Sequence, residues 1–314
     1  RMTTILVAPL MTCPARLIIY TLLIAAFVPA RSWFGGLVSL RGLVLMSFYL
    51  LGIMTAVVVA LALKWSMLRG GPAALLMEMP AYEWPSPRAV ALRVVERAWL
   101  FVRTAGTVIL LVSIVVWAAL YYPRPAEVAA PFAARRAALE TSLAGMSADN
   151  PKRTAVEGEL TGLTRKIDAA YQRQSFLARV GRAIEPVVRP LGWDWRIGAA
   201  VLASFPQREA VIATLGVIFS DDSPVTDDAA TDVSLANRLQ RATWEGSDRP
   251  LFTLPVALSI MVFYALCAQC VATLAVIRRE TGSWRWPAFS FGYLTALAYV
   301  GALITYQLGS WLAG

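Results

Sequence analysis

Residues 201–220 read VLASFPQREAVIATLGVIFS, an apolar stretch that proline, glutamine, arginine and glutamate interrupt in its middle. A charge at the depth of a bilayer costs about 3 kcal/mol or more, so an intramembrane carboxylate such as Glu209 indicates a functional site. Pro206 removes a backbone donor, and lipid tolerates a broken helix only where protein or a water-filled cavity covers it. Broken helices of this kind form the midplane sites of secondary transporters. The alternative is a structural Arg208–Glu209 pair, or a short helix that ends at a membrane surface.

The composition is that of a polytopic membrane protein. Of the 314 residues, 58% are hydrophobic and 16% are charged, and the formal net charge is +9. In such a chain the positive-inside bias and anionic lipid explain the basic charge better than nucleic acid does. The sequence begins at Arg1 without an initiator methionine or a signal-peptide pattern, so we expect a fragment of a longer chain or the product of a split gene.

Several kinds of catalytic site are excluded by the residues that are missing. The sequence contains no histidine, which excludes Ser-His-Asp and Cys-His catalysis and His-based zinc sites. It also contains no G-x-x-x-x-G-K-[ST] loop for nucleotide phosphates. We therefore do not expect this chain to be an enzyme.

Apolar runs divide the chain into six expected membrane-embedded segments. Residues 1–29 form a second broken segment, in which Pro9, Cys13 and Pro14 leave too few apolar residues to cross comfortably. Unbroken crossings are expected at residues 36–63, 104–122, 251–277 and 287–311. The basic residues between positions 64 and 103 are expected to lie inside, which places both chain ends on the cytoplasmic side.

The remaining segments have a polar or amphipathic character. Residues 87–103 predict a basic amphipathic helix at the interface. Residues 123–182 predict a solvent-exposed helical hairpin, whose second arm carries apolar residues at helical spacings: Val156, Leu160, Leu163 and Ile167. The acidic run after residue 220 is expected to be a solvated loop. The predicted fold is an all-α polytopic membrane protein with two broken or re-entrant helices and an extramembrane helical hairpin, divided into regions 1–122, 123–182 and 183–314.

Three polar clusters fall within the apolar segments, and two of them contain a thiol: Thr12-Cys13, Arg208-Glu209 and Gln269-Cys270. Thiolate is a soft ligand that favours iron, copper(I) or zinc over magnesium or calcium. Lone cysteines in membrane helices are more often small inert hydrophobic residues, so both interpretations remain open on the residues alone.

Two stretches resemble the Gate motifs of the bacterial ferrous iron transporter B family: MTCPARLIIY and ASFPQREAVIATLGVIF. Further segments similar to the family follow in its order: VERAWLFVRTAGTVIL, GRAIEPVVRPLGWDWRIG and AQCVATLAVIRRETGSWRW. By this similarity Cys13, Glu209 and Cys270 are the candidate residues for a ferrous iron path, while Cys267 is an additional cysteine. The resemblance covers nearly the whole chain.

The resemblance implies the membrane-spanning part of an Fe2+ uptake transporter in the cell inner membrane. GTP and Mg2+ would bind only in an amino-terminal GTPase domain absent from this sequence. The implied partners are membrane lipid, the GTPase portion of the same protein, small accessory subunits and further copies in a homo-oligomer, but no nucleic acid. The alternatives are another Gate-type permease, for nucleosides or organic ions, and a membrane scaffold subunit without a pathway of its own.

Overall fold

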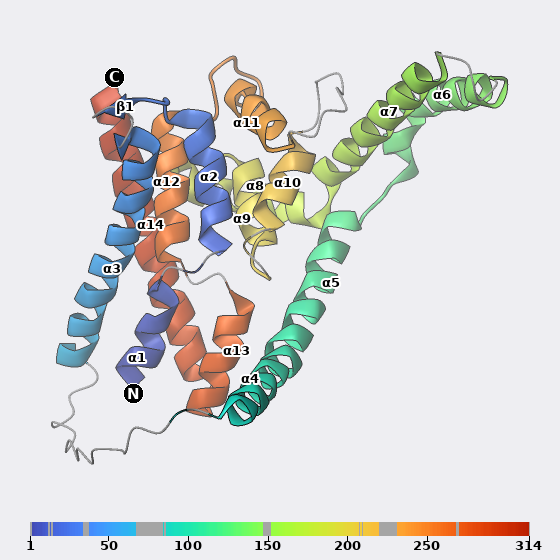
Figure 1. Cartoon of the computed structure of the whole chain (residues 1–314). Helices are drawn as coiled ribbons and strands as arrows, with labels where there is room; N and C mark the ends of the chain where they lie inside the picture. The colour runs from blue at the N-terminus through green and yellow to red at the C-terminus, as the bar shows by residue number, and fades with distance from the viewer. Residues whose placement is uncertain are drawn as a thin grey trace.

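The apolar stretches form helices that pack side by side in the computed structural model (Figure 1). The structure describes residues 2–11, 13, 15–33, 38–66, 84, 86–146, 152–206, 208, 210–219, 231–267 and 270–313. Its helical elements are α1 (Met2–Val7), η1 (Ala8–Leu10), α2 (Ala15–Phe27), α3 (Leu40–Ser66), α4 (Pro87–Phe101), η3 (Val102–Gly106), α5 (Thr107–Tyr121), α6 (Ala126–Ala144), α7 (Lys152–Gln174), α8 (Phe176–Val188), η4 (Arg189–Leu191), α9 (Trp195–Ala203), α10 (Ala210–Ile218), α11 (Thr231–Arg241), α12 (Leu254–Leu266), α13 (Val271–Thr281) and α14 (Arg285–Ala313). Strands β1 (Ser32–Trp33) and β2 (Val38–Ser39) form a short antiparallel pair. The predominantly helical membrane fold expected from the sequence is confirmed.

Three helical stretches in the described part of the chain are long and apolar enough to cross a membrane. They are α3, the α12–α13 stretch and α14, and α5 passes the same test only together with α6, at a bend of 70°. The side chains of α3 and α5 are largely exposed over their apolar surface, as expected for helices that face lipid.

Helices α12 and α14 pack extensively on each other in the described part of the chain, and small residues allow the close approach. Ala298 and Ala302 are completely buried, and a Cβ atom at Gly301 would lie 2.8 Å from the Leu266 side chain. At Gly309 a Cβ atom would lie 3.0 Å from Pro255. Small residues at such spacings bring helices together in membranes, where the hydrophobic effect does not drive them together.

The amphipathic helix α4 continues into α5 with no interruption of the helical conformation. The connection is a single π-helical turn, η3, from Val102 to Gly106. This shifts the expected start of the crossing from residue 104 to Thr107 and joins the basic helix to it. The aromatic end of α5 is formed by Trp117 and Tyr121, whose rings stack at 5.1 Å.

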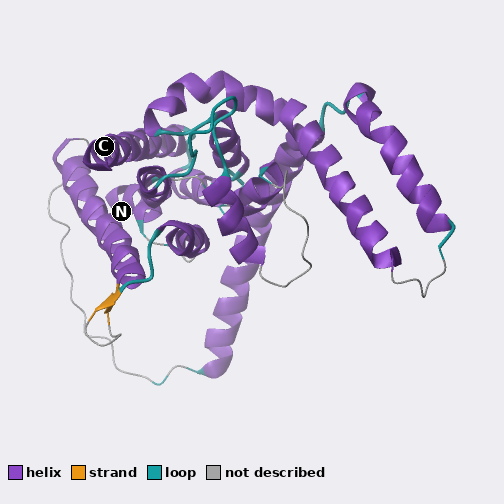
Figure 2. Ribbon diagram, turned by 90° about the horizontal axis from the view of Figure 1, so that it is seen from above, coloured by secondary structure: helices purple, strands orange, loops and turns teal. Residues whose placement is uncertain are grey.

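The expected helical hairpin is present as α6 and α7, which extend away from the helical body (Figures 1 and 2). Arg135 pairs with Glu159 across the hairpin, and near its base Arg124 pairs with Asp168 at 3.3 Å. Leu163 and Ile167 of the second arm are buried. The hairpin ends at α8, which packs on α9.

The two ends of the chain lie at opposite ends of the helical body (Figure 1). In a membrane crossed along the long axis of this body, the two ends would lie on opposite sides, whereas the sequence predicts both ends on one side. The difference arises at α9 and α10, which pack against each other, and α10 returns to α7 at the hairpin end of the body. The segment that contains α9 and α10 thus enters the body and leaves on the same side, which is the re-entrant form of the broken helix expected from the sequence.

Candidate metal path at three helix breaks

Three helices of the body are interrupted near its middle. A continuous membrane helix would form all of its backbone hydrogen bonds there. The first interruption separates η1 from α2, the second separates α9 from α10, and the third separates α12 from α13 (Figure 1). The first two fall where the sequence predicts broken helices. The third corrects the prediction of one unbroken crossing over residues 251–277.

At the first break, Cys13 is exposed and Arg16 is almost completely buried. The guanidinium group of Arg16 donates to the carbonyl oxygens of Leu10 and Pro9, at 3.2 and 2.9 Å. These carbonyls lie at the end of the first half-helix, where the last carbonyl groups of a helix lack partners within the helix. The side chain of Arg16 therefore caps the half-helix that precedes it.

At the second break, Ser204 and Pro206 are buried and Arg208 is 6% exposed. Arg208 reaches across to α12, where it donates to the carbonyl oxygens of Tyr264 and Cys267 at 3.3 and 2.8 Å. The predicted site residue Glu209 lies outside the described residues.

The third break explains where the carbonyl groups contacted by Arg208 come from. Cys267 has an extended backbone, with φ −77° and ψ 143°, and Cys270 is also extended before α13 begins. In a continuous helix the carbonyl of Cys267 would accept from the amide of Val271. Here the guanidinium group of Arg208 takes that carbonyl, so the interruption of the helix and the buried charge compensate each other.

The three cysteines differ in their surroundings. Cys13 is exposed, Cys270 is half-buried and Cys267 is 2% exposed. Arg16 lies within electrostatic range of Arg208 and of both Cys13 and Cys267. Arg16 is therefore the residue that these groups share as a neighbour, while Cys270 stands at the start of α13.

The start of α9 is held by a buried ion pair. Asp194 accepts from the backbone amide of Ile197 at 2.9 Å, as an N-cap, and from the side chain of Arg196. Arg196 also donates to the carbonyl oxygen of Thr243 and lies 4.8 Å from the ring centre of Phe219. One cation thus joins the start of α9 to the end of the α10 segment and to a later loop, which fixes the position of the second break.

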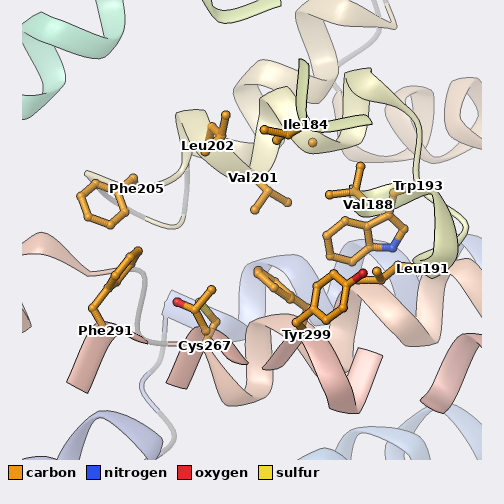
Figure 3. Close-up of a pocket in the computed structure, with 13 residues that line it drawn as sticks. Ile184, Val188, Leu191, Trp193, Val201, Leu202, Phe205, Cys267, Phe291 and Tyr299 are labelled. Carbon is orange, nitrogen blue, oxygen red and sulfur yellow. The ribbon is translucent and has the colours of Figure 1, made fainter. Parts of the chain in front are cut away.

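A cavity of about 200 Å³ lies between α8, α9 and the α12–α14 pair (Figure 3). Its wall is nearly all aliphatic and aromatic, with Phe205 and Phe291 at one side and Cys267 near them. A hydrated cation would lose its water there without gaining polar ligands in return. We therefore do not assign this cavity to the metal path.

Within the part of the chain that the structure describes, no three cysteine, aspartate or glutamate side chains are grouped closely enough to hold a metal ion. Glu209 is outside that part, so the predicted set of Cys13, Glu209 and Cys270 stays a prediction. Sequence reasoning missed the roles of Arg16 and Tyr264. The signal for Arg16 is the pattern Pro-x-Arg, which occurs at both of the first two breaks.

Two known protein families match the chain. Residues 102–284, more than half of the chain, match the family model Gate, described as nucleoside recognition. The chain belongs to the Gate family. Residues 45–97 match a second family model, ferrous iron transport protein B C terminus. The resemblance to the ferrous iron transporter B family is thus confirmed for this Gate chain.

The Gate chain is similar over nearly its whole length to several curated proteins. It is 35% identical over 309 residues to a Porphyromonas gingivalis protein named Fe(2+) transport protein A/Fe(2+) transporter FeoB fusion protein, covering 98% of this chain and 34% of that protein. It is 34% identical over 308 residues to the Fe(2+) transporter FeoB of Leptospira interrogans and 30% identical over 307 residues to that of Helicobacter pylori. These matches cover 98% of this chain and 39% and 44% of the two relatives. No solved structure matches the chain.

Proposed function

We propose that this chain is the membrane-spanning part of an Fe2+ uptake transporter of the cell inner membrane. The observation that carries the proposal is that cysteines stand at the interruptions of the helices. The chain is also similar over nearly its whole length to proteins named Fe(2+) transporter. Helix breaks in the middle of a membrane body supply the polar groups that an ion needs to leave water.

The proposed iron contacts are Cys13, Glu209 and Cys270. Two thiols and a carboxylate form a mixed soft and hard ligand set, which suits Fe2+ better than magnesium or calcium. Cys13 and Cys270 are the two cysteines with access to solvent, whereas Cys267 is buried. This difference in exposure supports the assignment of the first two to the path.

The complete transporter is proposed to carry its GTPase in a part of the protein beyond this sequence. GTP and Mg2+ would bind there, because the present chain contains no phosphate-binding loop. A relative that is named as a fusion with Fe(2+) transport protein A supports a small accessory partner. We also propose that the regions 1–122, 123–182 and 183–314 are the units of the membrane part.

The proposal is tested by uptake of radioactive iron in cells that lack their own ferrous iron transport and express the complete gene. We expect Fe2+ uptake above the empty-vector control, reduced by Glu209→Gln in protein that still reaches the membrane. Loss of the protein from the membrane in this variant would instead indicate a structural pair of Glu209 with Arg208. Uptake of nucleosides and not of Fe2+ would overturn the proposal in favour of the other Gate-type permease.

A further inference from the structure

The first two helix breaks share a short pattern that the proposed iron contacts do not use. Pro14-Ala15-Arg16 stands at the first break and Pro206-Gln207-Arg208 at the second. Both arginines are buried, and both donate to two carbonyl oxygens at the end of a half-helix. We propose that Arg16 and Arg208 are positioning residues that occupy the free carbonyls at two helix breaks and thereby fix the path proposed above for Fe2+.

Arg16 holds the first half-helix to the one that follows it. Its two terminal nitrogens bind the carbonyl oxygens of Leu10 and Pro9, while its own backbone lies in α2. The residues between these two anchors include Cys13, which is one of the proposed iron contacts. The position of this thiol is therefore set by a loop closed at both ends by one side chain.

Arg208 acts in the same way on a different helix. It comes from the second break but binds the carbonyls of Tyr264 and Cys267, at the end of α12. Cys270, the other proposed thiol contact, lies three residues further along the chain, directly before α13. Arg208 thus joins the re-entrant stretch to the broken crossing and sets where α13 starts.

Arginine suits this task better than lysine does. The planar guanidinium group presents several donors in a fixed fork, so it satisfies two carbonyl oxygens at once. The carboxyl end of a helix carries a partial negative charge, which a buried cation compensates. The charges of Arg16 and Arg208 are near enough to interact, so each depends on its own carbonyl pair for compensation.

This arrangement limits which groups bind iron. Broken helices commonly offer carbonyl oxygens to transported cations. At the first and third breaks, each of the carbonyls of Pro9, Leu10, Tyr264 and Cys267 accepts from a guanidinium group, whose positive charge repels a metal ion at the same oxygen. Only this statement about iron ligands rests on the proposed function. If Fe2+ passes the breaks, its ligands are side chains at the breaks and not these four carbonyls.

The test uses two buried reporter thiols in the complete transporter, each as the only cysteine of the chain. One is the native Cys267, which is 2% exposed, and the other is introduced by Leu10→Cys at a completely buried position. The carbonyls of these two residues are held by Arg208 and Arg16 respectively. The measurement is the rate at which a small membrane-permeant maleimide modifies each thiol.

We expect Arg208→Gln to speed modification of Cys267 by about tenfold or more and to leave the Leu10→Cys reporter unchanged, since one charged hydrogen bond is worth that factor. Arg16→Gln should give the reverse pattern. Arg→Lys at each site should restore protection in part. Arg136→Gln, on the exposed hairpin, is the matched control and should change neither rate.

Equal acceleration of both reporters by either variant, or of neither, would overturn the proposal. If a glutamine variant does not reach the membrane, the lysine variant decides the question: an unchanged rate at the matching reporter contradicts the inference. The labelling needs no iron. The positioning role can therefore fail while Fe2+ uptake persists, and it can hold even if the transported substrate is not Fe2+.

Discussion

The hydroxyl oxygens of Ser204 and Tyr264 lie 2.9 Å apart, and both residues are completely buried. Ser204 also donates to the carbonyl oxygen of Val201 at 2.7 Å, so its single proton is committed and the hydroxyl of Tyr264 is the donor. The backbone carbonyl of the same tyrosine accepts from Arg208. Tyr264 is thus bound from two sides by the second break, through its side chain and through its backbone.

This relationship predicts unequal effects of two conservative substitutions. Ser204→Ala leaves the tyrosine hydroxyl buried without its acceptor, at a cost of about 1–3 kcal/mol in the free energy of unfolding. Tyr264→Phe removes the donor while Ser204 keeps its bond to Val201, so it should cost only about 1 kcal/mol. Thermal unfolding of the purified protein in detergent measures both. A lower Tm for Tyr264→Phe than for Ser204→Ala would contradict the assigned direction of the hydrogen bond.

Two glycines with the same backbone conformation should respond differently to alanine. Gly192 and Gly246 both have φ 78°, and any other residue there costs about 1–2 kcal/mol. At Gly192 a Cβ atom would lie 2.2 Å from the ring of Tyr306, whereas at Gly246 it would meet nothing within 4 Å. Gly192→Ala should therefore lose a further 1–3 kcal/mol, roughly, through overpacking. Equal losses of Tm in the two variants would show that η4 does not pack on α14 in this way.

The thiols should differ in their contribution to uptake. Cys13→Ser and Cys270→Ser should each reduce Fe2+ uptake by about tenfold or more, since even indirect changes at metal sites have effects of that size. Cys267→Ala is the matched control and should leave uptake near normal, because that thiol is buried beside an apolar cavity. Uptake should also weaken as pH falls, since a thiol binds metal only after losing its proton. Normal uptake by the Cys13→Ser, Cys270→Ser double variant would exclude the thiols from the path.

The re-entrant course of residues 201–220 predicts which surfaces face outside. We expect the basic face formed by the starts of α4 and α14 to lie in the cytoplasm, with the hairpin and the end of α14 on the other side. In a chain without its native cysteines, Thr161→Cys and Ser310→Cys should react with a membrane-impermeant reagent on intact cells, and Ser283→Cys only after lysis. If Ser310→Cys does not react before lysis, the end of α14 lies in the cytoplasm and the chain crosses the membrane an even number of times.

Much of this architecture could be predicted from local sequence. The prolines of the first two breaks remove backbone donors, and the apolar runs of α3 and α14 are long enough to span a bilayer, so these elements were expected close to where they occur. The apolar spacing in the hairpin correctly placed Leu163 and Ile167 on a buried face. Each of these features is determined by residues that lie within a few helical turns of one another in the sequence.

The features that were missed depend on residues distant in the chain. No proline marks the third break, where the carbonyl of Cys267 is bound by Arg208, 59 residues away in the sequence. The helix α11 was expected to belong to a solvated loop, yet Leu235 and Leu239 are buried where α11 packs on α2. The sequence left open whether a broken segment crosses or returns, because the helices that pack against the segment decide this.

The hairpin of α6 and α7 has a practical consequence for imaging this protein. With 23 residues in α7, the arm is about 35 Å long at 1.5 Å per residue, a length comparable to the hydrocarbon thickness of a bilayer. One ion pair, Arg135 with Glu159, joins the two arms, and the hairpin lies apart from the helical body (Figure 2). An antibody fragment raised against this arm would add an off-centre mass to a small detergent-solubilised particle. The bound fragment would serve as a marker for aligning the particle images in electron microscopy, and it would not contact the helix breaks.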